Sequence, residues 1–352
     1  MLAGTMVPRP DTTPKVSFDG FIDAYYAWDV NRPYNFDRAY TTQPARHAEF
    51  NINLAFVGAR LAGPRYRGRL AIQFGTSVQA NYAGEPHIGG VSGPSVSQFL
   101  QEASIGYQLT PALWIDGGIF FAHTGYEGWV TRDNLAYSRS LIADFSPYYE
   151  AGVKLTWTPS SAVTAQLDLV NGWQDISHYN TPPAVGVRVD YVTSPAVTLS
   201  YDNFFGNVAP DSVAAKLRFY NDFIALYSPS DRWQFAAAFD VGLEGPSTPN
   251  GSAATWWGTS VFAKYHATQK IGVVARLERY ADPHQVIVRT GLSDPFRTSG
   301  VSLGVDVAPV ARVLWRTEVR AFRSDDPVWP THRVGVYARA DGFVLTSLAL
   351  TL

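Results

Sequence analysis

Apolar and polar residues alternate along much of the chain with a period of two. The segment 67–82 keeps this alternation throughout, and the pattern recurs in 148–157, 212–227, 232–244 and 311–321. In each segment one face is apolar and the other is polar or charged, which predicts β-strands. Soluble strands usually span 3–10 residues, whereas strands tilted across a bilayer need about 9–11 and often continue beyond it. The length of these segments therefore favours strands in a membrane, with 67–82 predicted as one long strand.

Short turns alternate with long connections between these segments. The short turns are rich in Pro, Ser and Gly and lie at 63–65, 110–112, 158–161, 193–196, 228–231, 268–270 and 308–310. The long connections lie at 31–45, 83–96, 125–147, 174–182, 206–211, 245–253, 282–296 and 324–331. This arrangement predicts an all-β fold, a closed antiparallel transmembrane β-barrel of about 16 strands. Short turns would face the periplasm, together with both termini, and long loops would face the outside of a bacterial outer membrane.

The composition agrees with a β-barrel in lipid. Charged residues are 16% of the chain, below the ~25% of a typical soluble domain, and hydrophobic residues are 46%. No apolar run approaches the ~18 residues that a membrane-spanning helix requires. The net charge of −2 argues against nucleic acid as a partner, because a basic footprint is missing. Outer-membrane lipid is the expected surrounding of the apolar faces.

Aromatic residues gather near the inferred strand ends. Amphipathic rings prefer the headgroup level of a membrane, so two aromatic girdles are expected. The candidates are Tyr25, Tyr26, Trp28, Tyr82, Tyr148, Tyr149, Trp157, Trp173, Tyr191, Tyr227, Trp233, Trp256, Trp257, Tyr265 and Tyr280.

Two regions of the chain are distinguished. Residues 1–15 are expected to form a periplasmic segment, or a small plug, and residues 16–352 the barrel. The first residues lack the basic start and apolar run of a signal peptide, so we expect that signal to have been removed. The final strand is predicted from an alternation that begins at Val334 and continues to Leu352.

Several stretches carry a family resemblance: DGFIDAYYAWDVNRP (19–33), AEFNINLAFVG (48–58), GTSVQANYAGEP (75–86), QEASIGYQL (101–109), LWIDGGIF (113–120), RDNLAYSRSLIADFSPYYEAGVKLTWTPS (132–160), NGWQDI (171–176) and FYNDFIALYSPSDRW (219–233). They resemble the OmpL-like beta-barrel porin-2 family. The resemblance is dense over residues 18–281 and weakens through the last four strands. It implies an outer-membrane barrel and carries no catalytic motif or defined substrate.

A barrel of this size predicts a pore. About eight strands fill their own interior with side chains, whereas 16–18 leave a water-filled lumen. We therefore expect an outer-membrane porin for passive diffusion of small hydrophilic solutes or ions. The alternative is a plugged or structural barrel that acts as a scaffold or attachment protein. By analogy with other porins of this size, a homotrimer is also expected.

Charged residues on the inward phase of the strands are candidates to line the pore. The basic candidates are Arg67, Arg69, Lys264, Arg276, Arg312, Arg316 and Arg320. The acidic candidates are Glu49, Asp116, Glu150 and Asp168. These sets would place a basic wall opposite an acidic wall and create a transverse field, or they would pair as salt bridges within the lumen; both arrangements remain open.

The connection 125–147 is the longest and the most apolar. A loop with this much apolar surface is unsuited to open water, so we expect it to fold into the barrel and narrow the pore. A lid over the rim, or packing on a neighbouring subunit, is the alternative. Its polar groups that would face the passage are Glu127, Arg132, Asp133, Arg139 and Asp144.

Enzymatic activity is not expected. The chain has no Cys, no Gly-x-Ser-x-Gly elbow and no His-Glu-x-x-His motif, and most of its seven His lie at rims or in loops. Adjacent Asp325 and Asp326 resemble a solvated loop more than a Ca²⁺ site. No cofactor and no bound metal are predicted.

Overall fold

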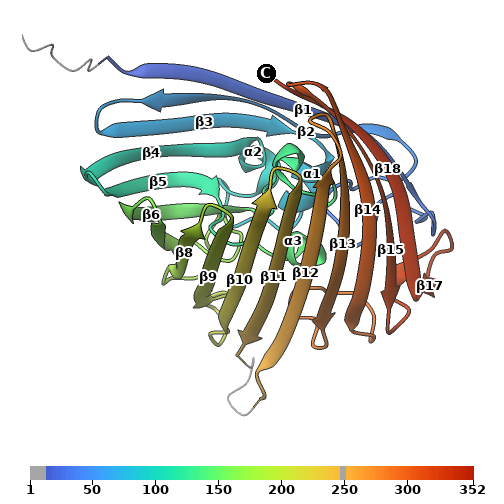
Figure 1. Cartoon of the computed structure of the whole chain (residues 1–352). Coiled ribbons are helices and arrows are strands. Elements are labelled where there is room, and N and C mark those ends of the chain that lie inside the picture. Colours follow the sequence, from blue (N-terminus) through green and yellow to red (C-terminus); the bar gives the residue numbers. More distant parts are fainter. Residues whose placement is uncertain (1–12, 246–250) are drawn as a thin grey trace, which may run out of the picture.

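The computed structural model describes residues 13–245 and 251–352. Its strands form one closed antiparallel barrel of sixteen strands, as the alternation predicts (Figure 1). The barrel closes where β1 (Lys15–Asp29) pairs with β18 (Ala340–Thr351), with Phe21 opposite Thr351 and Asp29 opposite Phe343. Most of the expected N-terminal segment, residues 1–12, lies outside the described residues.

The other barrel strands follow in chain order around the wall. They are β2 (Phe50–Ala62), β3 (Tyr66–Phe74), β4 (Leu100–Thr110), β5 (Leu113–Phe121), β6 (Tyr149–Ser160), β7 (Val163–Val170), β8 (Ala184–Ser194), β9 (Val197–Asn207), β10 (Leu217–Ser230), β11 (Trp233–Glu244), β12 (Ala254–His266), β13 (Ile271–Asp282), β14 (Phe296–Val310) and β15 (Val313–Ser324). Four short helices lie in the connections: α1 (Thr76–Tyr82), α2 (Pro94–Ser97), η1 (Thr131–Asp133) and α3 (Leu141–Asp144). None of the helices among these described residues is long and apolar enough to cross a membrane.

Successive residues of each strand face opposite sides of the wall. On β13, Leu277 is 65% exposed on the outer face, whereas its neighbours Arg276 and Glu278 are buried on the inner face. The outer face is apolar because the side chains there meet lipid, and the inner face carries the polar side chains. This is the period-two pattern of a transmembrane strand.

The predicted short turns all join neighbouring strands, while the last long connection contains extra structure. A hairpin of β16 (Trp329–Pro330) and β17 (Tyr337–Ala338) lies between β15 and β18. The final strand therefore does not begin at Val334, as the alternation predicted, but at Ala340. Arg339, between β17 and β18, interrupts the pairing, although its backbone carbonyl still accepts a hydrogen bond from Ser324 N.

The predicted strand 67–82 is wrong in its second half. β3 ends at Phe74, and residues 76–82 form helix α1, which packs inside the barrel. Gly75 makes the corner with φ +137°, and a Cβ at this position would lie 2.3 Å from the Asn53 carbonyl oxygen. Val78 and Tyr82, one helical turn apart, are both buried. A period of two and a period near four coincide at these two positions, so the alternation could not distinguish strand from helix.

The expected aromatic girdles contain only part of the predicted set. Exposed rings on the outer face or rim are Trp28, Trp157, Tyr191, Tyr227, Trp233 and Trp257. Buried rings are Tyr25, Tyr82, Tyr148, Tyr149, Trp256 and Tyr280. The buried rings pack against inward-folded loops, because those loops offer apolar surface inside the barrel.

Candidate functional site: the inward-folded third loop

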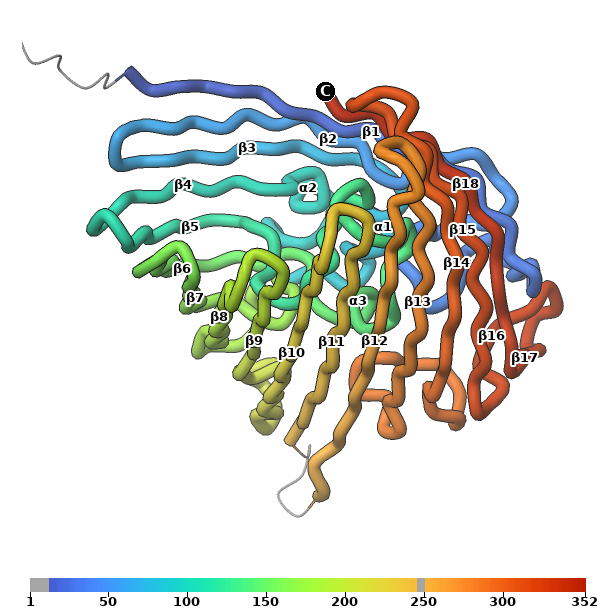
Figure 2. The backbone as a smooth tube through the Cα atoms, in the orientation of Figure 1, coloured from blue at the N-terminus to red at the C-terminus, as the bar shows by residue number. Residues whose placement is uncertain are grey.

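The connection between β5 and β6, residues 122–148 and named loop L3 here, lies inside the barrel. Within this loop, residues 134 and 136–144 are buried, and Leu135 between them is half-buried. Figure 2 shows the same segment running behind β10–β13 within the ring of strands. Its apolar side chains Tyr137, Leu141 and Ile142 pack with inward-facing Tyr25, Phe204 and Trp256. Apolar burial thus favours the inward position of L3.

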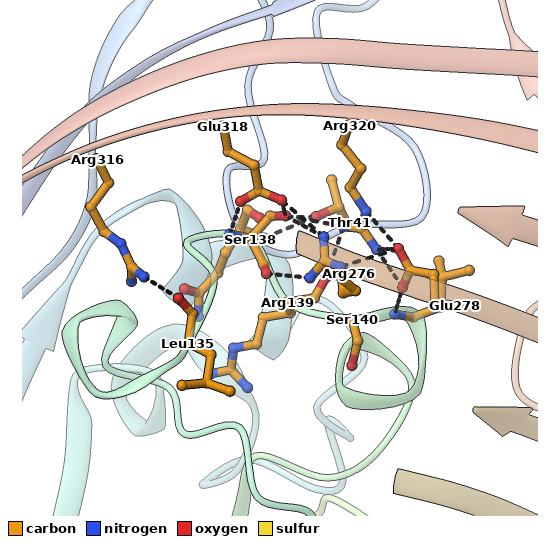
Figure 3. Close-up of polar contacts among 12 residues, drawn as sticks. Thr41, Leu135, Ser138, Arg139, Ser140, Arg276, Glu278, Arg316, Glu318 and Arg320 are labelled. Carbon is orange, nitrogen blue, oxygen red and sulfur yellow. Dashed lines mark hydrogen bonds and ion pairs between the residues drawn. The ribbon is translucent and has the colours of Figure 1, made fainter. Parts of the chain in front are cut away.

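Three arginines of two strands, β13 and β15, hold the backbone of L3. Arg276 donates to the Ser138 carbonyl oxygen at 2.6 Å, Arg316 to that of Leu135 at 2.7 Å, and Arg320 to that of Arg139 at 2.7 Å. Figure 3 shows these side chains reaching from the wall to the loop. Each guanidinium carries several fixed donors, so it can bind a loop carbonyl and a carboxylate together.

Two glutamates complete the attachment. Glu318 accepts from Ser138 N at 2.8 Å, from Ser138 Oγ at 2.8 Å and from Arg276 at 2.9 Å. Glu278 accepts from Leu141 N at 2.7 Å and from Arg320 at 2.8 Å. We call Arg276, Glu278, Arg316, Glu318 and Arg320 the L3 latch. Its charged side chains are buried and almost fully hydrogen-bonded, as a buried ionic network requires.

The basic residues of this wall are neutralised on the wall itself. Arg316 and Lys264 both bind Asp306, with Arg316 Nε 2.8 Å and Lys264 Nζ 2.5 Å from its carboxylate. Arg276 and Arg320 pair with Glu278 and Glu318. Of the two arrangements that the sequence left open, the structure therefore contains the salt bridges at these positions. Glu278 and Glu318 alternate with the arginines on the same inward face, so the strand phase could have identified them.

Asp23 on β1 holds L3 from a second side. Its carboxylate accepts from Thr131 Oγ1 at 2.9 Å and from Tyr137 Oη at 3.0 Å. Because β1 and β15 lie on either side of β18, L3 bridges this part of the wall. The aromatic ring of Trp129 extends further, packing near Tyr82 of α1. Sequence reasoning missed α1 as a second inward element, because its glycine corner was read as part of a strand.

The start of L3 is fixed by a buried histidine. His123 Nδ1 lies 3.0 Å from Glu150 and 3.8 Å from Asp168, and Nε2 lies 2.7 Å from the Asn203 carbonyl oxygen. Burial lowers the pKa of His123, but the carboxylates outweigh it and raise the pKa to about 9. The ring fits because β8 has a glycine here: a Cβ on Gly186 would lie 2.2 Å from the imidazole.

Three aspartates occupy one row of the inner wall beside L3. Asp202, Asp222 and Asp240 lie directly opposite one another on β9, β10 and β11. All three are buried, and each has one carboxylate oxygen without a hydrogen-bond partner. Arg188 supports one end of the row, 3.3 Å from Asp202. Like charges that lie directly opposite one another destabilise a sheet, so this row of carboxyl groups lowers the folding stability of the barrel.

The polar residues predicted for the loop have different environments. Glu127 is buried beneath Ser140, and burial raises its pKa. Arg139 stacks over Tyr148, with its Cζ 3.9 Å from the ring centre. Asp144 accepts from Thr42 Oγ1 of the first long loop at 2.7 Å. Arg132 reaches the Ala311 carbonyl oxygen at the periplasmic turn, whereas Asp133 is exposed.

Two predicted pore-lining residues lie outside the lumen wall. Glu49 precedes β2 and pairs with Arg46 at 3.0 Å in the first long loop. Arg312 lies in the tight periplasmic turn between β14 and β15 and is exposed. Both predictions failed because a strand phase extended past a strand end no longer reports a face of the sheet.

Polar side chains surround a cavity of about 350 Å³ in the periplasmic half of the lumen, on β2–β6. Arg67 Nε lies 2.6 Å from Asp116, and Arg69 binds Asp19 at 2.6 Å and Glu102 at 2.8 Å. The Lys154 ammonium lies 4.3 Å above the ring of Phe120. Cationic side chains at this cavity outnumber their anionic partners by one: the set is Arg60, Arg67, Arg69 and Lys154 against Asp19, Glu102 and Asp116.

The site offers no metal centre within the described chain. Over residues 13–245 and 251–352, no three or more His, Asp and Glu side chains are arranged to hold a metal ion. The chemistry that the lumen supplies is electrostatic: buried ion pairs position L3, and charged side chains remain around the β2–β6 cavity.

A sixteen-stranded antiparallel barrel with an apolar outer face, a charged inner face and an inward loop is an outer-membrane porin. The family model "Putative beta-barrel porin-2, OmpL-like" matches residues 15–346. The chain belongs to this family, whose members are porins of the bacterial outer membrane. The match reaches beyond residue 281 into the last strands, where the resemblance read from the sequence had weakened. Membership of a porin family indicates a channel rather than an enzyme.

Solved porin structures share the fold at low sequence identity. An anion-selective porin from Comamonas acidovorans has a TM-score of 0.62 at 11% identity, covering 97% of this chain and 100% of that one. The outer-membrane channel DcaP of Acinetobacter baumannii has 0.64 at 12%, covering 100% of both. OmpF of Salmonella typhi, solved with daunomycin, has 0.60 at 12%, covering 96% and 97%. Comparison with curated protein sequences finds no match.

Proposed function

We propose that this porin is a passive diffusion pore for small hydrophilic solutes or ions, narrowed near its middle by L3. The observation that carries the proposal is the L3 latch, which attaches the loop to β13 and β15 through buried charges. A loop held by several charge-assisted hydrogen bonds keeps a defined cross-section, which a size-limited pore needs.

The solute path is proposed to follow the β2–β6 side of the lumen. L3 binds the opposite side, at β12–β15, and the 350 Å³ cavity lies at β2–β6. The excess of cationic side chains around that cavity favours anions over cations. Lys154 contributes most freely, because among the described residues its ammonium group has no hydrogen bond or ion pair within 4 Å and lies over the Phe120 ring.

A homotrimer is the proposed assembly. One solved relative of the same fold, OmpT of Vibrio cholerae, is described in a trimer form. The outer face of β1, β2, β15 and β18 carries an apolar groove of about 740 Å³ that a second subunit could cover, lined by Ala24, Ile52, Trp315 and Leu348. Native mass spectrometry of the detergent-solubilised protein tests this assembly.

Single-channel recording in a planar bilayer tests the pore. Refolded protein should produce steps of fixed size, and a salt gradient should give a reversal potential of anionic sign. Lys154→Gln should shift that potential toward cation preference without changing step frequency. Silence from protein verified as folded and inserted would overturn the proposal and favour the alternative, a closed scaffold or attachment barrel.

A further inference from the structure

A second cluster of arginines lies on the outer face of the barrel, close to its extracellular rim. Arg279 on β13 is directly opposite Ser299 on β14, which is directly opposite Arg323 on β15. Arg323 in turn pairs with Ala340, and Arg339 precedes that residue at the start of β18. These four strands are neighbours in the wall (Figure 1). The register therefore places three guanidinium groups side by side.

These side chains face the membrane rather than the lumen. Leu277 and Val301, two residues nearer the periplasm on the same strand faces as Arg279 and Ser299, are 65% and 50% exposed in the apolar band. Ser299, Arg323 and Arg339 are themselves exposed. The cluster thus lies directly above the lipid-facing band, at the level where outer-leaflet headgroups lie.

The arginines surround a polar hollow. A cavity of about 370 Å³ is lined by Arg279, Ser299, Arg323, Ser324, Asp325 and Arg339. Asp325 neutralises only one of the guanidinium groups: its carboxylate lies 2.8 Å from Arg279. The positive surroundings lower the pKa of Asp325, with the Arg279 hydrogen bond as the largest cause. Within the described residues the side chains of Arg323 and Arg339 have no hydrogen bond or ion pair.

We propose that this hollow, named the rim arginine site, binds the phosphate of an outer-leaflet lipid. Guanidinium groups present planar paired donors that match phosphate oxygens, and clustered basic residues at a membrane surface recognise anionic lipid headgroups. Two free guanidinium groups and the Ser299 hydroxyl supply donors, while the acyl chains would lie along Leu277 and Val301 below. The lipid phosphate is favoured over a free phosphate because only a lipid would cover both the charged row and the apolar band.

Binding of bis-phosphorylated lipid A to the detergent-solubilised full chain, measured by native mass spectrometry, tests the site. The double variant Arg323→Gln with Arg339→Gln should bind lipid A about tenfold more weakly or worse, since two charge-assisted contacts are lost. The matched control is Arg232→Gln with Arg312→Gln, which removes the same charge from exposed turns at the opposite rim. This control should bind like the parent protein.

A second variant and two competitors make the test decisive. Ser299→Asp places a carboxylate between Arg279 and Arg323 and should also abolish binding, while heat-dependent gel mobility verifies that each barrel is folded. Dephosphorylated lipid A should bind weakly, and inorganic phosphate should not displace lipid A at equal concentration. Equal binding by the double variant and its control would overturn the site. Displacement by inorganic phosphate would overturn the assignment to a lipid.

Discussion

Removal of Glu318 should release L3 from the barrel wall. In Glu318→Ala, Ser138 loses both of its hydrogen bonds to the carboxylate, and Arg276 loses its contact at 2.9 Å. Of its two carboxylate partners, Arg276 would keep only the more distant Glu278, at 3.4 Å, beside its hydrogen bonds to Ser138. Removal of one partner from a buried ion pair typically costs ~3–5 kcal/mol, because the other charge remains buried and unpaired. That energy corresponds to roughly two to four powers of ten in the equilibrium between attached and released loop.

Two assays report whether L3 is attached to the barrel wall or released from it. Single-channel recordings of Glu318→Ala should show a larger mean conductance and more open-state noise than the parent, since the released loop no longer fixes the cross-section. Limited trypsin digestion should cut after Arg132 or Arg139 in the variant, whereas Arg139 is buried in the parent. Mass spectrometry of the fragments identifies the cut.

Glu244→Ala is the matched control for the loss of a buried carboxylate. Glu244 binds Arg218 at 2.9 Å and also Lys216, and forms no hydrogen bond or ion pair with L3. This variant should lose stability and keep both the conductance and the trypsin resistance of the parent. If Glu318→Ala and Glu244→Ala behave alike, or if L3 stays uncut in Glu318→Ala, the latch does not hold the loop.

Three further perturbations probe the packing and charge of the lumen. Gly258→Val should displace α3 and increase conductance, because a Cβ there lies 2.4 Å from Ile142; unchanged conductance would contradict the packing. Asp222→Asn should stabilise the barrel by ~1 kcal/mol, because it relieves repulsion from Asp202 and Asp240; a lower denaturant midpoint would oppose this. Protonated His123 favours the folded loop below pH ~6.5, and this contribution is lost as the pH rises through about 9, because the folded-state pKa is raised. Thermal stability should therefore fall between pH 7 and 10. The fall should be smaller in His123→Asn, because asparagine does not titrate. Parallel pH profiles of the two proteins would contradict a stabilising role of protonated His123.

Local sequence was sufficient for the wall of the barrel. The alternation at β10, β11 and β15 assigned the membrane-facing and lumen-facing residues, because side chains of a strand alternate whatever the neighbours are. The turns marked by Pro and Ser then gave the strand number, and the apolar content of 125–147 indicated an inward loop. The same local rule was wrong at Gly75, where the backbone leaves the strand, and at Glu49 and Arg312, which lie beyond strand ends.

Only the tertiary structure decided which charges meet. Arg276 and Glu318 are far apart in sequence, and they contact one another and Ser138 because β13 and β15 flank β14 in the closed wall. The row Asp202, Asp222 and Asp240 likewise depends on the register between three strands. Strand phase determines which side of the sheet a residue faces, but register and loop path determine its partners. Those depend on closure of the whole barrel, which no local pattern contains.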